Sequence, residues 1–283
     1  MSMVETRTFV GHAGRKLAMD MAGDPDAQGV ILLHGGGQTR HAWQRTIKRL
    51  VAGGYHVGAY DLRGHGDSEW AGDEGYTLDA QVGDLRAAMA LFKHPPVLVG
   101  ASFGGLISLV ATGEGQVAPL AIVLVDVTPR VDRQGEARIL AFMQGHRDGF
   151  ASIDEAADAI AAYLPHRQRP TDTSGLKRNL RQRGERWFWH WDPDLFVTLD
   201  AAGEQAQPRL ESAAAAIRVP ALLVRGALSE LVDESSAADF NALVPHARCV
   251  DVRNAHHMVA GDNNDTFSSA VLQFLDEIAG STL

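Results

Sequence analysis

The chain has 283 residues, of which 45% are hydrophobic and 22% charged, a composition typical of a globular protein. Its formal net charge of −9 comes from scattered acidic residues, which argues against a nucleic-acid-binding surface. The single cysteine, Cys249, excludes an intrachain disulfide, and no apolar run approaches the roughly 18 residues that a membrane span needs.

The N-terminal region alternates apolar and polar residues over Thr6–Val10 and Lys16–Met21, which predicts a hairpin. Short, continuous apolar runs follow, a pattern typical of strands that are buried on both faces of a parallel sheet. These runs are Gly29–Leu33, His56–Tyr60, Pro96–Gly100, Leu120–Val125 and Pro220–Val224, with Ala247–Val252 as the final strand candidate.

Helical patterns lie between the predicted strands. Apolar residues recur at spacings of three and four over Thr77–Phe92, with Thr77 as the N-cap, and again over Asp265–Ala279. Strands that alternate with helices predict an α/β fold with a mostly parallel, doubly wound sheet. The sequence therefore predicts a core made of residues 1–127 and 218–283.

The alternation breaks over residues 128–217. This region shows helical patterns at Gln134–Arg147 and Ile153–Tyr163, and no convincing strand. We expect a mainly helical lid, inserted before the next-to-last strand and lying over the carboxyl ends of the strands. Its tryptophans Trp187, Trp189 and Trp191 are candidates for the substrate pocket or for anchors to the core.

A basic run occurs inside this insertion. Residues 177–186 (KRNLRQRGER) carry five positive side chains and one negative. We interpret the run as a solvated helix face. The alternative is a basic rim over a pocket, which would suit a substrate that carries a carboxylate.

The strongest chemical signal is the sequence Gly-Ala-Ser-Phe-Gly at residues 100–104, which matches G-x-S-x-G. It lies directly after an apolar strand and directly before an apolar helix. A serine on such a sharp turn needs small neighbours, and the start of the helix supplies free N–H groups. This context predicts that Ser102 is a nucleophile.

With three further segments, the chain resembles the α/β-hydrolase superfamily, in its serine-nucleophile branch of esterases and cofactor-free haloperoxidases. His34-Gly35-Gly36-Gly37 resembles the oxyanion loop, Asp61–Ser68 (DLRGHGDS) resembles the D-x-R-G-x-G-x-S turn, and residues 250–265 resemble the loop of the catalytic histidine. The resemblance covers nearly the whole chain and is weakest in the insertion.

The resemblance implies that the amides of Gly36 and Phe103 bind the oxyanion, with Gly37 beside the substrate pocket and His34 as a brace of the loop. It implies a structural role for the charged residues of the DLRGHGDS turn. Glycines at an oxyanion loop let the backbone approach a carbonyl oxygen closely.

The general base should be a histidine after the last strand, where two adjacent candidates stand, His256 and His257. Successive residues of extended backbone point in opposite directions, so only one should face Ser102. The resemblance favours His257, because a hydrophobic residue follows it, and leaves His256 at the rim of the pocket.

The acid of a catalytic triad usually follows the next-to-last strand, and the resemblance therefore favours Glu230. Similar enzymes most often have aspartate at this position. Asp126, at the end of the strand Leu120–Val125, is the alternative acid. Asp233 is a third candidate, which we expect instead to cap the helix that begins near Glu234.

We therefore predict a cofactor-independent serine hydrolase that cleaves a small to medium carboxylic ester, or a thioester or lactone. The alternatives are hydrolysis of a carbon–carbon bond in ring-cleavage products, perhydrolase or haloperoxidase-like activity, and a ligand receptor on a hydrolase scaffold. No metal-ligand spacing or nucleotide-binding motif occurs, so we expect neither metal nor cofactor. Without a signal-peptide pattern, we expect a cytoplasmic protein whose partner is a small-molecule substrate, with no nucleic-acid or membrane partner.

Overall fold

The apolar runs of the sequence build the centre of the molecule. The computed structural model describes residues 4–72, 75–130, 132–165, 168–169 and 171–281, without the side chains of residues 199–205 and 281. Eight of its strands form one sheet, in the order β1-β2-β4-β3-β5-β6-β9-β10. Their bounds are β1 Glu5–Val10, β2 Lys16–Ala22, β3 Gly29–Leu33, β4 His56–Tyr60, β5 Val97–Ala101, β6 Ala121–Val125, β9 Ala221–Gly226 and β10 Arg248–Val252.

Strand directions follow the prediction. β1 and β2 form the antiparallel N-terminal hairpin, β2 also runs antiparallel to β4, and all later neighbours are parallel. From β3 the chain first proceeds to β4 on one side and then to β5 on the other. This change of direction opens a crevice at the carboxyl ends of β3 and β5, where ligands bind in open α/β sheets.

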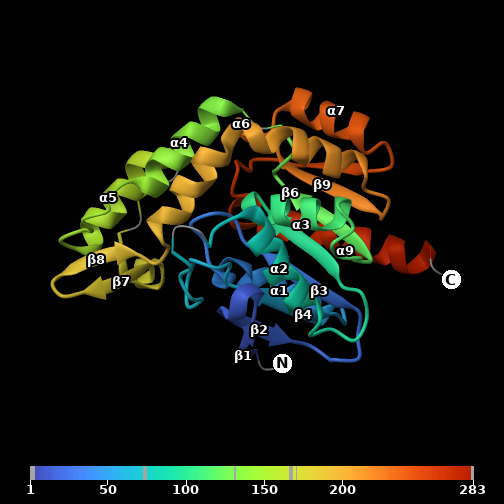
Figure 1. Ribbon diagram of the computed structural model, residues 1–283, viewed down its shortest axis with the longest axis horizontal. Coiled ribbons are helices and arrows are strands. Elements are labelled where there is room, and N and C mark those ends of the chain that lie inside the picture. Colours follow the sequence, from blue (N-terminus) through green and yellow to red (C-terminus); the bar gives the residue numbers. More distant parts are fainter. Residues whose placement is uncertain (1–3, 73–74, 131, 166–167, 170, 282–283) are drawn as a thin grey trace.

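The sheet has a separate hydrophobic core on each face, because successive side chains of a strand point in opposite directions. In β3, Ile31 and Leu33 belong to one core, and Val30 and Leu32 belong to the other. Helices cover both faces (Figure 1). The second core includes α1 (Gln44–Ala52) and α9 (Asn264–Ser281), and the first includes α2 (Leu78–Met89), α3 (Phe103–Gly113) and α7 (Glu234–Leu243). The predicted α/β fold is confirmed.

The helix caps that the sequence predicts are present. The Thr77 side chain accepts a hydrogen bond from the amide of Ala80 at the start of α2. Asp233 does the same for the amide of Ser236 at the start of α7, which is the structural role predicted for it. The short elements η1 (His12–Gly14), η2 (Arg40–Trp43) and α8 (Val259–Asp262) connect the larger ones.

Between β6 and β9 the chain leaves the sheet. It forms α4 (Arg133–Gln144), α5 (Ile153–Tyr163), η3 (Ser174–Asn179), the hairpin β7 (Leu180–Arg183) and β8 (Arg186–Trp189), and α6 (Pro193–Ala215). The expectation that this region contains no strand is wrong. Each hairpin strand has only four residues, and only the pair Leu180 and Trp189 buries its side chains, so the apolar signal is too short to identify a strand.

Helix α6 joins the insertion to the core (Figure 1). It begins at an Asp192 cap with Pro193 in its first turn, a favoured position for proline, and it contains Pro208 in its interior. Its carboxyl-terminal half packs on α3 so closely that a Cβ added to Gly113 would lie 2.0 Å from the Ala213 carbonyl oxygen. The insertion is therefore attached to the core by a continuous helix, and the boundaries at residues 128 and 217 stay predictions.

Candidate active site

Ser102 occupies a strained turn between β5 and α3. Its backbone angles are φ 47° and ψ −116°, a conformation that side-chain-bearing residues rarely adopt. Its amide donates to the Val125 carbonyl at 3.0 Å. A Cβ added to Gly100 or Gly104 would lie 2.4 or 2.6 Å from a backbone oxygen, so both positions require glycine. The turn predicted from G-x-S-x-G is present, and it places Ser102 on the wall of a cavity.

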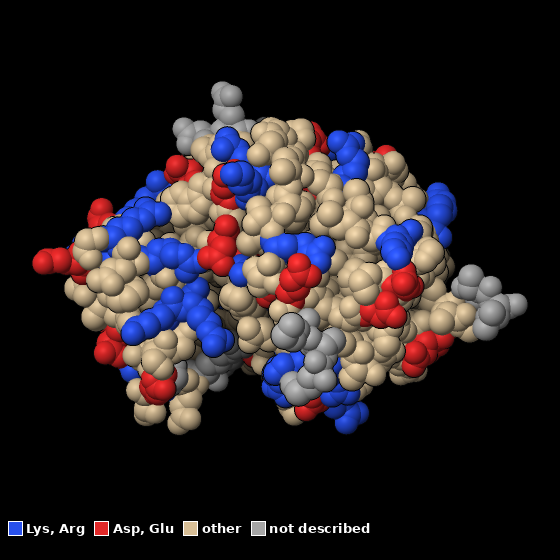
Figure 2. Space-filling view, turned by 90° about the horizontal axis from the view of Figure 1, so that it is seen from below, with Lys and Arg blue, Asp and Glu red and all other residues tan. Residues whose placement is uncertain are grey.

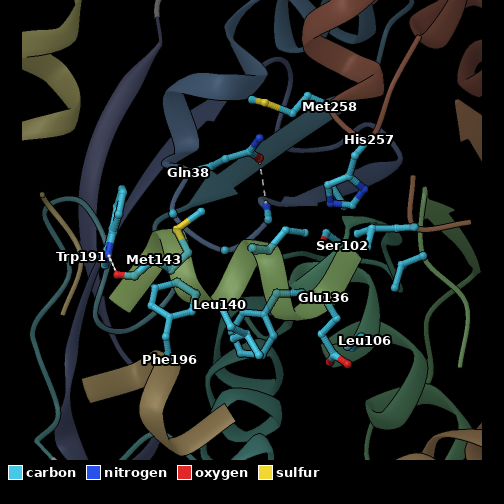
Figure 3. A pocket seen from close by; sticks show the side chains of 18 of the residues that line it. Gln38, Ser102, Leu106, Glu136, Leu140, Met143, Trp191, Phe196, His257 and Met258 are labelled. Carbon is cyan, nitrogen blue, oxygen red and sulfur yellow. Dashed lines mark hydrogen bonds between the residues drawn. The ribbon is translucent and has the colours of Figure 1, made fainter. Parts of the chain in front are cut away.

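His257 lies on the same cavity wall, beside Ser102 (Figure 3). Its Nδ1 is 2.8 Å from Oδ2 of Asp126, whose side chain is fully buried. A carboxylate only accepts hydrogen bonds, so Nδ1 carries the proton and Nε2 has the free lone pair. The structure thus brings together Ser102, His257 and Asp126.

The placement of Glu230 beside the imidazole of His257 is wrong. The Glu230 carboxylate is 41% exposed, and its Oε2 lies 3.8 Å from Nδ1 of the neighbouring His256. The loop after β9 turns so that Ser229, rather than Glu230, faces the centre of the site. His256 is not among the residues found to line the cavity, so its placement at the pocket is not supported either.

Asp126 is held by three hydrogen-bond donors, two from the end of β9 and the loop after it and one from His257. Its Oδ1 accepts from the amide of Gly226 at 2.8 Å, and its Oδ2 accepts from the Ser229 hydroxyl at 2.5 Å as well as from His257. The Ser229 oxygen in turn accepts from the amides of Leu231 and Val232. These donors satisfy a buried carboxylate and fix its orientation. The sequence does not single out Ser229, because nothing in the local pattern distinguishes it from other loop serines.

The glycine loop after β3 lies beside Ser102. Two of its amides are already used, since Gly35 donates to Gln38 Oε1 at 3.1 Å and Gly37 donates to His65 Nε2 at 3.0 Å. Within the described part of the chain, the amides of Gly36 and of Phe103 have no hydrogen-bond acceptor. Phe103 is the first residue of α3, where amides lack a partner in the helix. These are the two donors predicted for an oxyanion.

His34 braces this loop from beneath, as predicted. It is fully buried, its Nε2 accepts from the amide of Leu62 at 3.0 Å, and its Nδ1 therefore donates to the Gly35 carbonyl at 2.8 Å. Burial lowers the pKa of His34 to about 3, and repulsion from His190 and Arg40 adds to the decrease. His34 is neutral at physiological pH and acts on the loop through hydrogen bonds.

The charged residues of the DLRGHGDS turn connect loops, as predicted. Arg63 binds the buried carboxylate of Asp84 through two hydrogen bonds of 2.6 and 2.7 Å. Arg40 forms a buried ion pair with Asp61 and another with Asp20 at 3.0 Å. Pairing of this kind is needed because an uncompensated buried charge is strongly destabilising.

The cavity beside Ser102 has a volume of about 820 Å³. Its wall is mainly apolar and aromatic, and much of it comes from the insertion (Figure 3). Apolar lining residues from α4, α5 and α6 include Leu140, Met143, Ile160, Phe196 and Leu210. Gly36, Gly37 and Phe103 also contribute to the lining.

Two of the three insertion tryptophans contribute to this wall. Trp189 and Trp191 line the cavity and stack on each other, with ring centroids 4.7 Å apart. Trp191 also donates from Nε1 to the Met143 carbonyl at 3.0 Å. Trp187 is not among the lining residues and instead pairs its backbone with Phe150. The pocket placement proposed for Trp187 is therefore not supported.

The basic run 177–186 forms the end of η3 and the β7–β8 hairpin rather than a helix face. Figure 2 shows Lys and Arg side chains gathered on this side of the molecule. None of the five cations is among the described lining residues of the cavity. Arg181 pairs with Asp67 at 2.9 Å, and Arg183 lies over the rings of Trp70 and Phe188. Asn179 is the residue of the run that lines the cavity, and in the described lining the basic side chains of the run contribute no rim.

The alpha/beta hydrolase fold family model matches residues 29–263 of this chain. The chain belongs to the α/β-hydrolase fold family. Among curated relatives, it is 34% identical to esterase Rv0045c of Mycobacterium tuberculosis over 260 residues, which cover 87% of this chain and 82% of that protein. It is 28% identical to the 3-hydroxybutyrate-oligomer hydrolase of Cupriavidus necator over 258 residues, covering 86% of this chain and 87% of that protein.

Solved structures give the same result for the fold. E-2-(acetamidomethylene)succinate hydrolase matches with a TM-score of 0.85 at 20% identity, over 97% of this α/β-hydrolase and 100% of that chain. The M. tuberculosis esterase Rv0045c matches with a TM-score of 0.75 at 28% identity, over 97% of this chain and 92% of that chain. The predictions that this chain is an α/β-hydrolase and an enzyme are confirmed. None of its described helices is long and apolar enough to cross a membrane.

The buried His34 predicts an acid-sensitive fold. An unfolded chain binds a proton on this residue below the ordinary histidine pKa of about 6.5, whereas the native state excludes the proton down to about pH 3. Its contribution to stability is therefore complete above pH 6.5 and is lost as the pH falls, by about 1.4 kcal/mol per pH unit. Urea unfolding at pH 7, 6 and 5 should give a shallower pH dependence for His34→Gln than for the wild type.

The exposed His94 provides a matched control for this measurement. The variant His94→Gln should keep the wild-type dependence of the unfolding free energy on pH. Equal slopes for wild type, His34→Gln and His94→Gln between pH 6 and 5 would contradict the assignment of His34 as a buried neutral group.

Proposed function

We propose that this α/β-hydrolase is a serine esterase, which cleaves a small to medium carboxylic ester through an acyl-enzyme on Ser102. One observation carries the proposal: the strained Ser102 shares a cavity wall with His257, whose Nδ1 is held by the buried Asp126. The esterase Rv0045c, at 34% identity, supports ester hydrolysis at the level of the family.

The geometry supports a two-step reaction. Nε2 of His257 takes the proton of the Ser102 hydroxyl while Oγ attacks the carbonyl carbon, and the amides of Gly36 and Phe103 bind the oxygen that becomes negative. The tetrahedral intermediate then expels the alcohol, which receives the proton from His257. Water, activated by the same imidazole, hydrolyses the acyl-enzyme. Asp126 holds the imidazole in its tautomer and stabilises the imidazolium.

The cavity favours a neutral acyl group. In the described lining, Arg209 is the only lysine or arginine, and it is already paired with Asp79 and Glu114. A carboxylate placed against apolar walls without a cationic partner loses its hydration without compensation. This argues against a ring-cleavage product that carries a carboxylate. Neutral thioesters and lactones require the same steps as esters and fit the same site.

We expect a fluorophosphonate probe to label Ser102, because the strained turn exposes its hydroxyl beside a base. Peptide mass spectrometry locates the adduct. The variant Ser102→Ala should lose both the adduct and the hydrolysis of a p-nitrophenyl ester. A second variant, Ser108→Ala, removes a buried hydroxyl six residues further along the chain, in α3, and should keep both. An adduct on another serine of the folded protein would end the serine esterase proposal.

For the acid, we compare Asp126→Asn with Glu230→Gln, which both remove a charge while keeping the side-chain size. Asp126→Asn leaves the His257 tautomer unfixed and should lower kcat by about 10⁴-fold. Glu230→Gln should stay within about threefold of the wild type, since Glu230 is half-exposed and does not reach His257. If Glu230→Gln lost most of its kcat while Asp126→Asn kept it, the acid would be Glu230.

Charge selectivity tests the substrate class. Two p-nitrophenyl esters of equal acyl length, one ending in a methyl group and one in a carboxylate, differ mainly in charge. We expect kcat/KM for the neutral ester to be higher by about 100-fold, because the carboxylate has no available cation in the apolar cavity. Comparable values for the two esters, measured at pH 7 and low ionic strength, would refute the neutral-substrate proposal.

A further inference from the structure

His190 connects the insertion to the glycine loop beside Ser102. It directly follows strand β8, is 1% exposed, and stands 153 residues after Gly37 in the chain. The amide of Gly66 donates to His190 Nδ1 at 2.9 Å. This contact fixes the tautomer with the proton on Nε2, and Nε2 donates to the Gly37 carbonyl at 3.2 Å. The insertion thus supplies a hydrogen bond to the loop.

Three imidazoles from separate segments hold three successive peptide groups of this loop. His34 donates to the carbonyl of Gly35, His65 accepts from the amide of Gly37, and His190 donates to the carbonyl of Gly37. In a trans peptide the C=O and the following N–H point in opposite directions. The bond from His34 therefore sets the direction of the Gly36 amide, and the other two fix the peptide groups that follow it.

The backbone of Gly37 needs the two hydrogen bonds from His65 and His190 to stay in one conformation. Its φ of +72° lies in the left-handed region, where glycine has several accessible conformations and no side chain to restrict them. Without His65 and His190, the peptide groups on both sides of Gly37 could rotate, and the Gly36 amide would be held by the His34 bond alone. A donor must be preorganised to stabilise an oxyanion.

We propose that His190 is a positioning residue. Through its hydrogen bond to Gly37, the packing of the insertion on the core sets the geometry of the oxyanion loop. This proposal rests on the esterase function proposed above. Burial lowers the pKa of His190 well below its usual value, with repulsion from His65 and Arg181 as further causes, so the imidazole remains the neutral donor that the geometry requires.

The surrounding contacts allow His190 to be changed without loss of the fold. The same segment is also held by the Asp192 amide, which donates to the Gly64 carbonyl at 2.8 Å, and by Tyr76, whose hydroxyl donates to the Asp192 carboxylate at 2.7 Å. The neighbouring Trp191 is anchored to Met143. Thermal unfolding of each variant verifies that the fold is retained.

Two amide substitutions separate the two hydrogen bonds of the imidazole. In His190→Asn, Oδ1 takes the place of Nδ1 and still accepts from Gly66, but the side chain is too short to reach Gly37. In His190→Gln, Nε2 of the amide takes the place of the imidazole Nε2 and still donates to the Gly37 carbonyl. We expect His190→Asn to lower kcat by about tenfold with KM changed by less than about threefold. The loss is smaller than the 10²–10³-fold effect of removing an oxyanion donor itself.

The glutamine variant should keep kcat within about threefold of the wild type. A trifluoromethyl ketone, which forms an oxyanion adduct with an active serine, should bind His190→Asn more weakly by the same factor that kcat loses. Hydrogen–deuterium exchange over residues 34–40 provides a readout independent of activity, and it should be faster in His190→Asn than in wild type or His190→Gln.

The following results for the two His190 variants would overturn the proposed role of His190. If both variants have the kcat of the wild type, or if both lose kcat equally, the hydrogen bond from His190 to Gly37 does not position the loop. Faster exchange in His190→Asn with unchanged kcat would show that loop order does not control the reaction. If the wild type hydrolyses no ester, the esterase proposal fails by itself. Exchange over residues 34–40 then still decides whether His190 orders the loop.

Discussion

The geometry of the site depends on one buried carboxylate. Asp126 lies at the end of β6, where its φ of 51° turns the side chain toward the end of β9. It receives hydrogen bonds from Gly226 at the end of β9, from Ser229 in the loop that follows β9, and from His257 in the loop after β10. A buried carboxylate is tolerated only if its oxygens accept hydrogen bonds, so Asp126 ties the end of β9 and the loop after β10 to β6. The orientation of His257 toward Ser102 follows from that arrangement.

Much of this architecture could be predicted from the sequence, because its causes are local. A continuous apolar run such as Gly29–Leu33 has few alternatives to a strand buried on both faces, and the glycines around Ser102 are required by a turn of a few residues. His257 could be chosen over His256 only through the resemblance to a family. The position of Glu230 away from His257 has a related reason. Chain order favours Glu230, but the direction of a side chain in the loop after β9 is set by contacts with Asp126, a hundred residues earlier.

The insertion was less predictable, because its order depends on contacts between short elements. The β7–β8 hairpin buries only the Leu180–Trp189 pair of its four residue pairs, and α6 contains Pro208, which interrupts a helical pattern. His190 carries no local signal at all. It is a single histidine between two tryptophans, and its role appears only when the insertion is placed beside the Gly37 loop. Sequence patterns identify residues whose neighbours in the chain constrain them, and His190 is constrained by residues far away.

This arrangement has a consequence for how the cavity and the reaction centre are related. The two residues that follow β8 have different contacts: His190 donates to the Gly37 carbonyl of the glycine loop, and Trp191 lines the cavity beside Ser102. Trp191 in turn is anchored through Met143, which packs near Gly37. We therefore expect a change in cavity shape that shifts Trp191 to affect His190 and its bond to the glycine loop as well. Under the esterase mechanism and the role of His190 proposed above, substrate fit and oxyanion geometry are coupled through the two residues that follow β8.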